Sequence, residues 1–349
     1  MHFSPLIALA GLLVGFTVGL TGMGGGALMT PILVILFGIN PGTAVSSDLL
    51  ASLIMKPIGA SVHRRQGTIS WTLAGWLAVG SVPSAFAGVF VLRQLGTGTH
   101  VTDWIKTLLG WALIVAAVSM VAKAMLVGRD RRRAREQVEE PRIDALDVKR
   151  VATILVGVAG GFVVGMTSVG SGSLMMVMLL LLYPTLSAKQ LVGTDLVQAI
   201  PLVASATLSH LLFGHVDFGL TGTILVGSVP GVYLGARVSS RAPDAVIRPV
   251  LVVVLFASAL KLLNFSNGAL GFAVVVLVLV GAPLWGATDA SLRSPEQWEA
   301  AGVRRTTWVT AQATTAPFLI GFPIAIVYWA TVRRRLAVAE VTTAPSAVT

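Results

Sequence analysis

The stretch GLTGMGGGALMTPIL, residues 19–33, decides how this sequence folds, because five of its first eight residues are glycine. Apolar residues surround the stretch on both sides, as in a segment that enters a membrane. Glycine weakens a helix interior and permits backbone turns that other residues resist. The sequence therefore predicts two helical segments, near 4–22 and 24–38, joined by a glycine-rich break.

The composition places the whole chain in a membrane. Of its 349 residues, 55% are hydrophobic and 11% are charged, and the mean hydropathy is +0.84. Such values exclude an ordinary soluble enzyme. The chain has no cysteine, so disulfides, thiolate nucleophiles and cysteine-bound zinc are excluded as well. The N-terminus lacks the basic region of a secretory signal, which predicts that its apolar segment is retained.

Apolar runs of the length that crosses a bilayer recur along the chain and predict an all-α polytopic membrane protein. After the first two segments, further spanning or embedded segments are expected near 43–63, 70–92, 103–127, 150–168, 170–184, 189–212, 218–240, 246–265, 268–288 and 306–331.

The basic residues lie between these runs, where they determine topology. The net charge of +10 therefore does not indicate a nucleic-acid partner. The longest polar stretch, 128–149, is rich in arginine and is predicted to be a cytoplasmic linker. The C-terminal region is ambiguous, because Arg304–Arg305 and Arg333–Arg335 flank the single apolar run 306–331. Either one of these clusters lies on the unexpected side or the run does not cross the membrane fully.

The chain contains an internal repeat. Residues 15–29 match residues 161–175 at nine positions, and VSSDL at 45–49 matches VGTDL at 192–196. The motif GSVP also occurs twice, at 80–83 and at 227–230. Such self-similarity indicates a tandem duplication. Because the charges place the start of the first copy outside and the start of the second inside, we expect two repeats of inverted topology, as in many secondary transporters.

The repeat sets the expected domain organisation. A first transmembrane repeat, a cytoplasmic linker, a second transmembrane repeat, a C-terminal transmembrane extension and a polar tail are expected at 1–127, 128–149, 150–265, 266–335 and 336–349. The second helix of each broken pair is too short for a full crossing, which favours re-entrant or discontinuous hairpins.

The two glycine-rich breaks are the predicted substrate site. Free N–H groups at the start of a helix attract anions, and glycine lets a ligand approach the backbone. The candidate residues in the breaks are Thr21, Gly22, Gly24, Gly25, Gly26, Thr167, Ser168, Gly170, Ser171 and Gly172.

Two carboxylates at equivalent positions, Asp48 and Asp195, are expected beside the breaks. An ionisable group within a membrane segment is costly and indicates function. They either accept hydrogen bonds from the broken backbone or carry a coupling proton, and both roles are compatible. The neighbouring Ser47 and Thr194 are candidate hydroxyl donors, although small-residue helix packing would explain them equally well.

Further candidates are single polar residues within the apolar runs. Lys56 has Val203 at the equivalent position, so it either attracts an anion or extends its ammonium group to the interface. His63 and His210 are candidate proton relays, but structural roles are more common for such residues. Gln198 is either a ligand contact or a helix-packing amide.

Several catalytic motifs are not supported. The glycines at 22–27 lack the βαβ context of a dinucleotide site. Ser171 would be an intramembrane nucleophile, but Gly25 occupies the matching position of the first copy. No cluster suggests a metal, and we expect neither a metal nor a cofactor.

The ordered, duplicated motifs resemble the sulfite exporter TauE/SafE family over residues 5–265. They are the two hairpins, VSSDLL and VGTDLV, RRQGTISW and FGHVDF, and the paired GSVP. This resemblance implies a bacterial-type inner-membrane permease for sulfite, sulfonates or other small organic anions. The linker and residues 266–349 depart from the family's simplest pattern.

The sequence thus predicts a multi-pass secondary transporter of the cell membrane, not an enzyme, that carries a small anion by alternating access with optional proton coupling. The expected partners are this anion and membrane lipids, without nucleic acid, and self-association is left open. The alternative is a non-transporting membrane subunit or an intramembrane enzyme.

Overall fold

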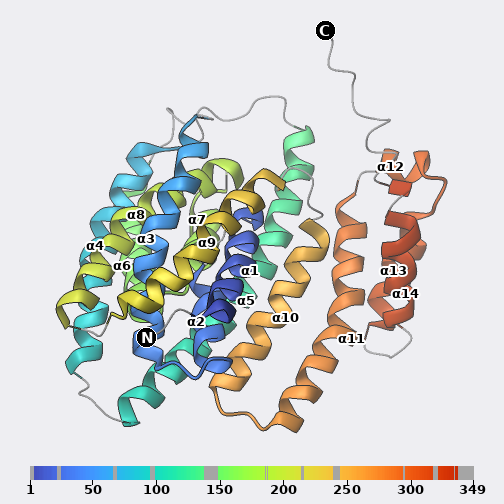
Figure 1. Ribbon diagram of the computed structural model, residues 1–349. Helices are drawn as coiled ribbons and strands as arrows, with labels where there is room; N and C mark the ends of the chain where they lie inside the picture. The colour runs from blue at the N-terminus through green and yellow to red at the C-terminus, as the bar shows by residue number, and fades with distance from the viewer. Residues whose placement is uncertain are drawn as a thin grey trace. The chain divides into compact units, whose positions relative to one another are not determined.

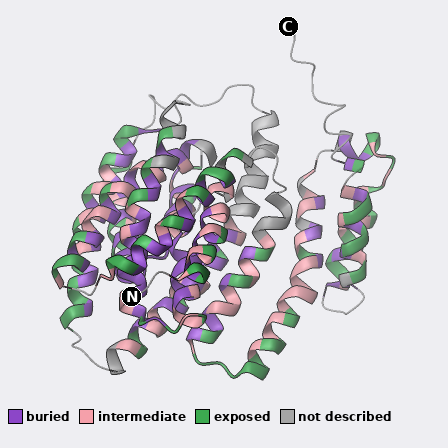
Figure 2. Ribbon diagram, in the orientation of Figure 1, coloured by how far each residue is buried: buried purple, intermediate pink, exposed green. Residues whose placement is uncertain are grey.

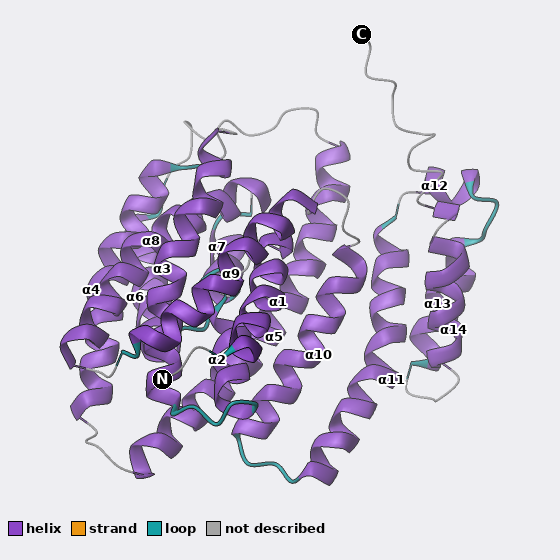
Figure 3. Cartoon of the chain, viewed as in Figure 1, coloured by secondary structure: helices purple, strands orange, loops and turns teal. Residues whose placement is uncertain are grey.

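The computed structural model describes residues 4–21, 25–65, 69–94, 99–136, 148–184, 186, 188–213, 216–238, 244–293, 295–316, 321–333 and 335–336. Within these residues all regular structure is helical (Figure 3). Six of the described helices are long and apolar enough to cross a membrane: Trp71–Gln94, Thr102–Ala122, Arg150–Thr167, Gln190–Phe213, Phe218–Gly235 and Asn267–Ser291. The expected class, an all-α polytopic membrane protein, is confirmed.

The chain divides into two compact units. The first comprises Met1–Lys123 and Pro141–Phe265, and the second comprises Ala124–Glu140 and Ser266–Thr349. The helices of the first unit lie side by side in one bundle (Figure 1). They are α1 (Pro5–Thr21), α2 (Gly26–Ile35), α3 (Pro41–Arg65), α4 (Trp71–Gln94), α5 (Thr99–Glu136, shared with the second unit), α6 (Arg150–Thr167), α7 (Leu174–Leu182), α8 (Ala188–Phe213), α9 (Phe218–Val238) and α10 (Asp244–Leu262).

Helices from the first half of this unit pack against helices from its second half. α1 packs on α9 and α6 packs on α4, while α3 and α8 pack on each other. By the sequence repeat, α1 corresponds to α6 and α4 to α9, so the two large contacts are equivalent. The helix backbones touch at equivalent points, because a methyl group at Gly15 would overlap with the Ser228 carbonyl oxygen and one at Gly161 with that of Ser81. Close approach of this kind is how small residues join helices in lipid.

The buried residues of the first unit concentrate where these helices meet (Figure 2). They include large apolar side chains such as Leu49, Leu73 and Met175, together with polar residues such as Asp48, Ser81 and Asp195. Buried polar groups are costly unless they are paired, so their concentration marks the region that needs a functional explanation.

The second unit contains α11 (Asn267–Leu292), α12 (Pro295–Ala300), α13 (Arg305–Thr315) and α14 (Gly321–Val327). A π-helical turn, Tyr328–Val332, continues α14. A small core forms around Ala290, Trp298 and Tyr328.

The structure adds detail to two sequence expectations. The linker expected from residue 128 is helical up to Glu136, because α5 continues into the arginine-rich segment. Arginine, alanine and glutamate are good helix formers. The run 306–331 is not one spanning helix either, since α13 ends at Thr315 and α14 begins at Gly321.

Candidate functional site

Each predicted break lies between two described helices. The first separates α1 from α2, and the second, between Thr167 and Leu174, separates α6 from α7. In the second break Ser168 has φ 58°, Gly170 has φ 120° and Gly172 has φ 90°. This left-handed backbone region favours glycine, which explains why the break needs glycine at two of these positions.

The two breaks touch each other. A methyl group at Gly26 would overlap with the carbonyl oxygen of Ser168 and would lie 2.6 Å from its Oγ. The start of α2 is therefore in direct backbone contact with the turn that ends α6. Segments 142 residues apart in sequence form one structural centre.

Asp48 of α3 is bonded to this centre. Its Oδ2 accepts a 2.6 Å hydrogen bond from the Ser168 hydroxyl and a longer one, 3.4 Å, from Thr30 of α2. Its Oδ1 has no hydrogen-bond partner among the described residues, although Asp48 is fully buried. A first-half carboxylate thus joins the helix after the first break to the turn of the second, and one of its oxygens remains available.

Lys56 reaches the second break from the same helix. Its Nζ donates a 3.0 Å hydrogen bond to the Ser171 hydroxyl, and only 7% of the residue is exposed. The ammonium group interacts electrostatically with both Asp195 and Asp48. The side chain therefore does not extend to the interface, which was one of the two readings of the sequence.

Gln198 and Asp195 approach the centre from α8. Asp195 is 3% exposed and Gln198 is 1% exposed. The Gln198 amide donates to the Ser81 hydroxyl of α4, whereas its Oε1 has no partner among the described residues. The amide oxygen and Asp48 Oδ1 are thus two buried acceptors without a hydrogen-bond partner among the described residues.

Other candidate hydroxyls hold the fold together. The Thr194 hydroxyl accepts from the Ser70 backbone N–H at 3.0 Å and donates to Gln190. At the equivalent positions of the other half, the Ser47 hydroxyl donates to the Asp217 carbonyl at 3.4 Å. Both pairs attach the start of α4 or α9 to the opposite half. The structure therefore favours the packing explanation for Ser47 and Thr194.

Thr167 and His210 also make structural contacts. The Thr167 hydroxyl donates to Val163 and accepts from the Val169 backbone N–H. The His210 Nε2 lies 3.2 Å from the Gly165 carbonyl oxygen. Gly22 and Gly24 lie outside the described residues, as do the side chains of Thr21 and His63.

The two short helices begin without side-chain caps. Neither Gly25, before α2, nor Ser173, before α7, caps its helix through a side chain. The first N–H groups of a helix have no partner within it and carry the positive end of its dipole. Both helix starts belong to the breaks described above. At the start of α7 the N–H groups of Ser173 and Met175 donate to the Gly170 carbonyl oxygen, so part of its donor capacity is used within the break.

Thr30 and Ser81 were missed by the sequence reasoning. Thr30 bonds Asp48, and Ser81 bonds Gln198. Ser81 is inside the repeated GSVP motif, so its duplication was an available signal. No pattern in the sequence distinguished Thr30, because threonine is a common small residue at helix contacts in membranes.

A cavity of about 220 Å³ lies beside the second break. Apolar side chains of α5 and α6, including Trp111 and Phe162, line most of it, and it reaches Thr167 and Gly170. Since Asp48, Asp195 and Gln198 are buried, the polar centre itself is closed to solvent in this structure.

The long apolar helices define a multi-pass membrane protein, and broken helices beside buried ionisable residues are features that transporters use. The sequence model of the family "Sulfite exporter TauE/SafE" matches residues 7–262. The chain belongs to this family. No solved structure matches the chain.

Curated relatives carry transporter names. The probable membrane transporter protein YjnA of Bacillus subtilis is 41% identical over 261 residues, which cover 74% of this chain and 100% of YjnA. YdhB of the same organism is 25% identical, and the match covers 74% of this chain and 99% of YdhB. MJ0441 of Methanocaldococcus jannaschii is 28% identical, with 74% and 95% covered. Both are also named probable membrane transporter proteins.

Proposed function

We propose that this transporter carries a small oxyanion, such as sulfite, an organosulfonate or a related organic acid, through the centre formed by the two breaks. The observation that carries the proposal is Lys56, a buried ammonium group held 3.0 Å from the Ser171 hydroxyl. A buried cation beside uncapped helix starts is a setting that attracts an anion. Ser171 and the backbone of Gly25, Gly26, Gly170 and Gly172 would contact the substrate.

The charges at this centre support proton coupling. Asp48 and Asp195 together carry two negative charges when ionised, against the single positive charge of Lys56. An anion added to this set would meet a net negative site, and repulsion in a low-dielectric interior is strong. Protonation of one carboxylate would remove that repulsion. We therefore expect the anion to move together with a proton, carried by Asp48 or Asp195.

The packing of the repeats supports alternating access. Inverted repeats with discontinuous helices allow one half to rock against the other around a central site. The equivalent contacts of α1 with α9 and of α6 with α4 supply two matching surfaces for such a motion. The closed polar centre would then be an occluded state between the two open ones.

Flux into proteoliposomes tests the proposal. Purified protein should transport labelled sulfite, a sulfonate or a small carboxylate under an imposed pH gradient. Asp48→Asn and Asp195→Asn should each reduce this flux at least about tenfold, whereas Asp103→Asn, at a surface ion pair, should not. Failure to move any of these anions under any ion gradient would reject the proposal.

An intramembrane hydrolase is the rival function, because a lysine beside a serine is also the arrangement of a Ser–Lys dyad. The 3.0 Å contact of Lys56 with Ser171 is the one observation that favours it. A serine-directed fluorophosphonate separates the two functions. A transporter leaves Ser171 unlabelled, and Ser171→Ala retains measurable flux; labelling that disappears in Ser171→Ala would support the hydrolase.

A further inference from the structure

The C-terminal part of the second unit, residues 266–349, lies outside the residues that match the family and contains a charged cluster near the end of α11. Asp289 Oδ2 accepts a 2.7 Å hydrogen bond from the Tyr328 hydroxyl and a 3.2 Å bond from Arg293 Nε. Arg333 Nε forms an ion pair with the same oxygen at 3.6 Å. The first residue of the π-helical turn, Tyr328, and the residue that follows the turn, Arg333, are thus fixed to the last turns of α11.

The start of α13 is fixed at the same place. Arg305 Nη2 donates a 2.6 Å hydrogen bond to the Ser291 carbonyl oxygen. Ser291 is two residues beyond Asp289 on α11. Since Arg305 and Arg333 both attach there, the chain between them leaves one end of α11 and returns to that end. α13 and α14 accordingly lie beside each other (Figure 1).

The helices of this hairpin are too short to span a bilayer. α13 has 11 residues, and α14 with the π-helical turn has 7 and 5 residues. At 1.5 Å per residue, each arm extends about 16–18 Å, roughly half of a hydrocarbon core. This length resolves the ambiguity of the sequence: both arginine clusters lie at one face, because the run between them does not cross.

The hairpin nevertheless suits a lipid environment. The exposed hydroxyls of Thr310, Thr314 and Thr331 donate to carbonyl oxygens of their own helices, which satisfies them without water. The amide of Gln312 is fully buried against Gly286 of α11. Its Nε2 donates to the Trp308 carbonyl oxygen, and its Oε1 has no partner among the described residues, so the polar groups that face outward from the arms are the satisfied threonine hydroxyls.

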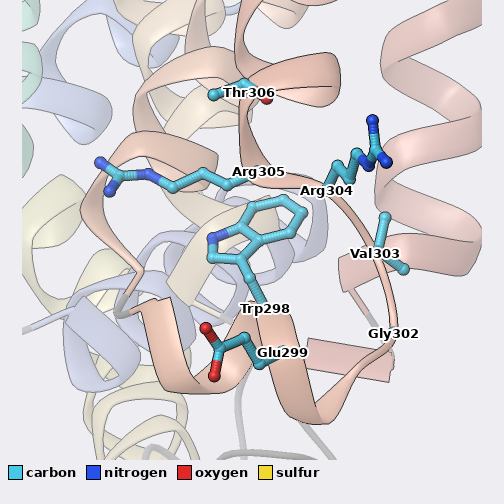
Figure 4. Close-up of a pocket in the computed structure, with 7 residues that line it drawn as sticks. All are labelled: Trp298, Glu299, Gly302, Val303, Arg304, Arg305 and Thr306. Atoms are coloured by element: carbon cyan, nitrogen blue, oxygen red, sulfur yellow. The ribbon is translucent and has the colours of Figure 1, made fainter.

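The end of the unit that carries both clusters has an excess of basic residues. Its described cationic residues are Arg293, Arg304, Arg305, Arg333 and Arg335, and the described acidic residues near them are Asp289, Glu296 and Glu299. Arg304 and Arg305 point to opposite sides of the Trp298 ring (Figure 4), although both line one open cavity of about 420 Å³. Diverging guanidinium groups do not converge on a single small anion, but they match a layer of separate phosphate groups.

We propose that the arginine-bearing end of the second unit docks on the anionic headgroup layer of one membrane leaflet, with α13 and α14 inserted as a hairpin that enters and leaves through that leaflet. The positive-inside rule assigns this face to the cytoplasm. This inference does not depend on the transported substrate.

Cysteine accessibility tests the hairpin. Because the chain has no native cysteine, only the introduced cysteine can react in each variant. Ala300→Cys and Arg335→Cys should react with an impermeant maleimide from the same side of sealed membranes. Gly268→Cys, at the other end of α11 with open space around its side chain, should react from the opposite side. Reaction of residue 335 on the side of residue 268 would overturn the proposal.

Native mass spectrometry of the full chain tests the lipid preference. Phosphatidylglycerol should bind more tightly than phosphatidylcholine, and Arg304→Gln with Arg335→Gln should weaken its binding about tenfold. Arg93→Gln with Lys106→Gln, which removes two cations of the first unit, is the matched control and should change the affinity less than twofold. Equal affinity for the two lipids, or an unchanged affinity in the Arg304/Arg335 variant, would overturn the proposal.

Discussion

The Ser168 hydroxyl donates a 2.6 Å hydrogen bond to Asp48 Oδ2, so the carboxylate of one repeat is joined to the break of the other. Asp195, the equivalent carboxylate, cannot receive the same hydroxyl bond from the first break, because Gly22 occupies the position equivalent to Ser168. Likewise Lys56 corresponds to Val203, and Ser171 corresponds to Gly25. The duplicated framework is similar in the two halves, but its charged and hydroxyl groups are not, so we propose that substrate contacts concentrate at the second break.

Replacement of Ser168 by glycine should impair transport without unfolding the protein. Glycine accepts φ 58° without strain, while Asp48 Oδ2 would retain only the longer bond from Thr30. Hydrogen bonds to charged groups contribute about 1.5–3 kcal/mol, so we expect flux to fall about tenfold or more. Ser173→Gly, in the same break but without a cap bond, is the control. Wild-type flux in Ser168→Gly would contradict the role of this bond.

Loss of the Lys56 charge should weaken substrate binding. Lys56→Met removes the proposed anion contact and should raise the apparent KM for the anion at least about tenfold, as expected for a charge-assisted bond. Lys56→Arg should restore part of the affinity. The control is Lys106→Met, which removes a lysine from a surface pair with Asp103 at 3.5 Å. A KM that is the same in Lys56→Met as in wild type would exclude direct anion binding by this residue.

Contact between the two breaks should be sensitive to one methyl group. Gly26→Ala would push against the Ser168 carbonyl oxygen, and overpacking of this kind costs about 1–3 kcal/mol. Gly75→Ala, on α4, has open space around the new methyl group and should be neutral or stabilising by up to about 1 kcal/mol. Thermal unfolding in detergent measures both variants. Equal melting temperatures would show that the breaks do not touch.

Equivalent glycines of the two repeats should have equal importance. Gly15→Ala and Gly161→Ala each place a methyl group against the backbone of Ser228 or Ser81, so both should lower the melting temperature by similar amounts. Gly222→Ala, with open space around its methyl group, should not. A strong effect in only one of the two glycine variants would contradict the equivalent packing of α1 on α9 and α6 on α4.

The framework was predictable from the sequence, whereas the contacts within the site were not. The expected segment near 150–168 matches α6, Arg150–Thr167, because apolar length and composition determine a membrane helix locally. The contact of Lys56 with Ser171 joins residues 115 positions apart, and no periodicity encodes such a distance. Ser47 and Asp48 are adjacent in sequence, yet one packs helices and the other enters the centre, since neighbouring residues on a helix face different directions.

The same limit explains the C-terminal region. Its arginine clusters suggested a conflict only while 306–331 was read as one span. In the proposed hairpin this conflict disappears, because Arg333 pairs with Asp289 and Arg305 bonds Ser291 at the same end of α11. Hydropathy records the apolar content of a segment but not whether the chain turns back within it.

The most direct test of the central claim is simultaneous measurement of anion and proton flux in proteoliposomes that contain a pH-sensitive dye. We predict that labelled anion uptake acidifies the lumen in wild type, and that Asp48→Asn or Asp195→Asn abolishes this proton movement. Anion uptake that proceeds at the wild-type rate in both variants, with unchanged proton movement, would contradict coupled transport through this centre.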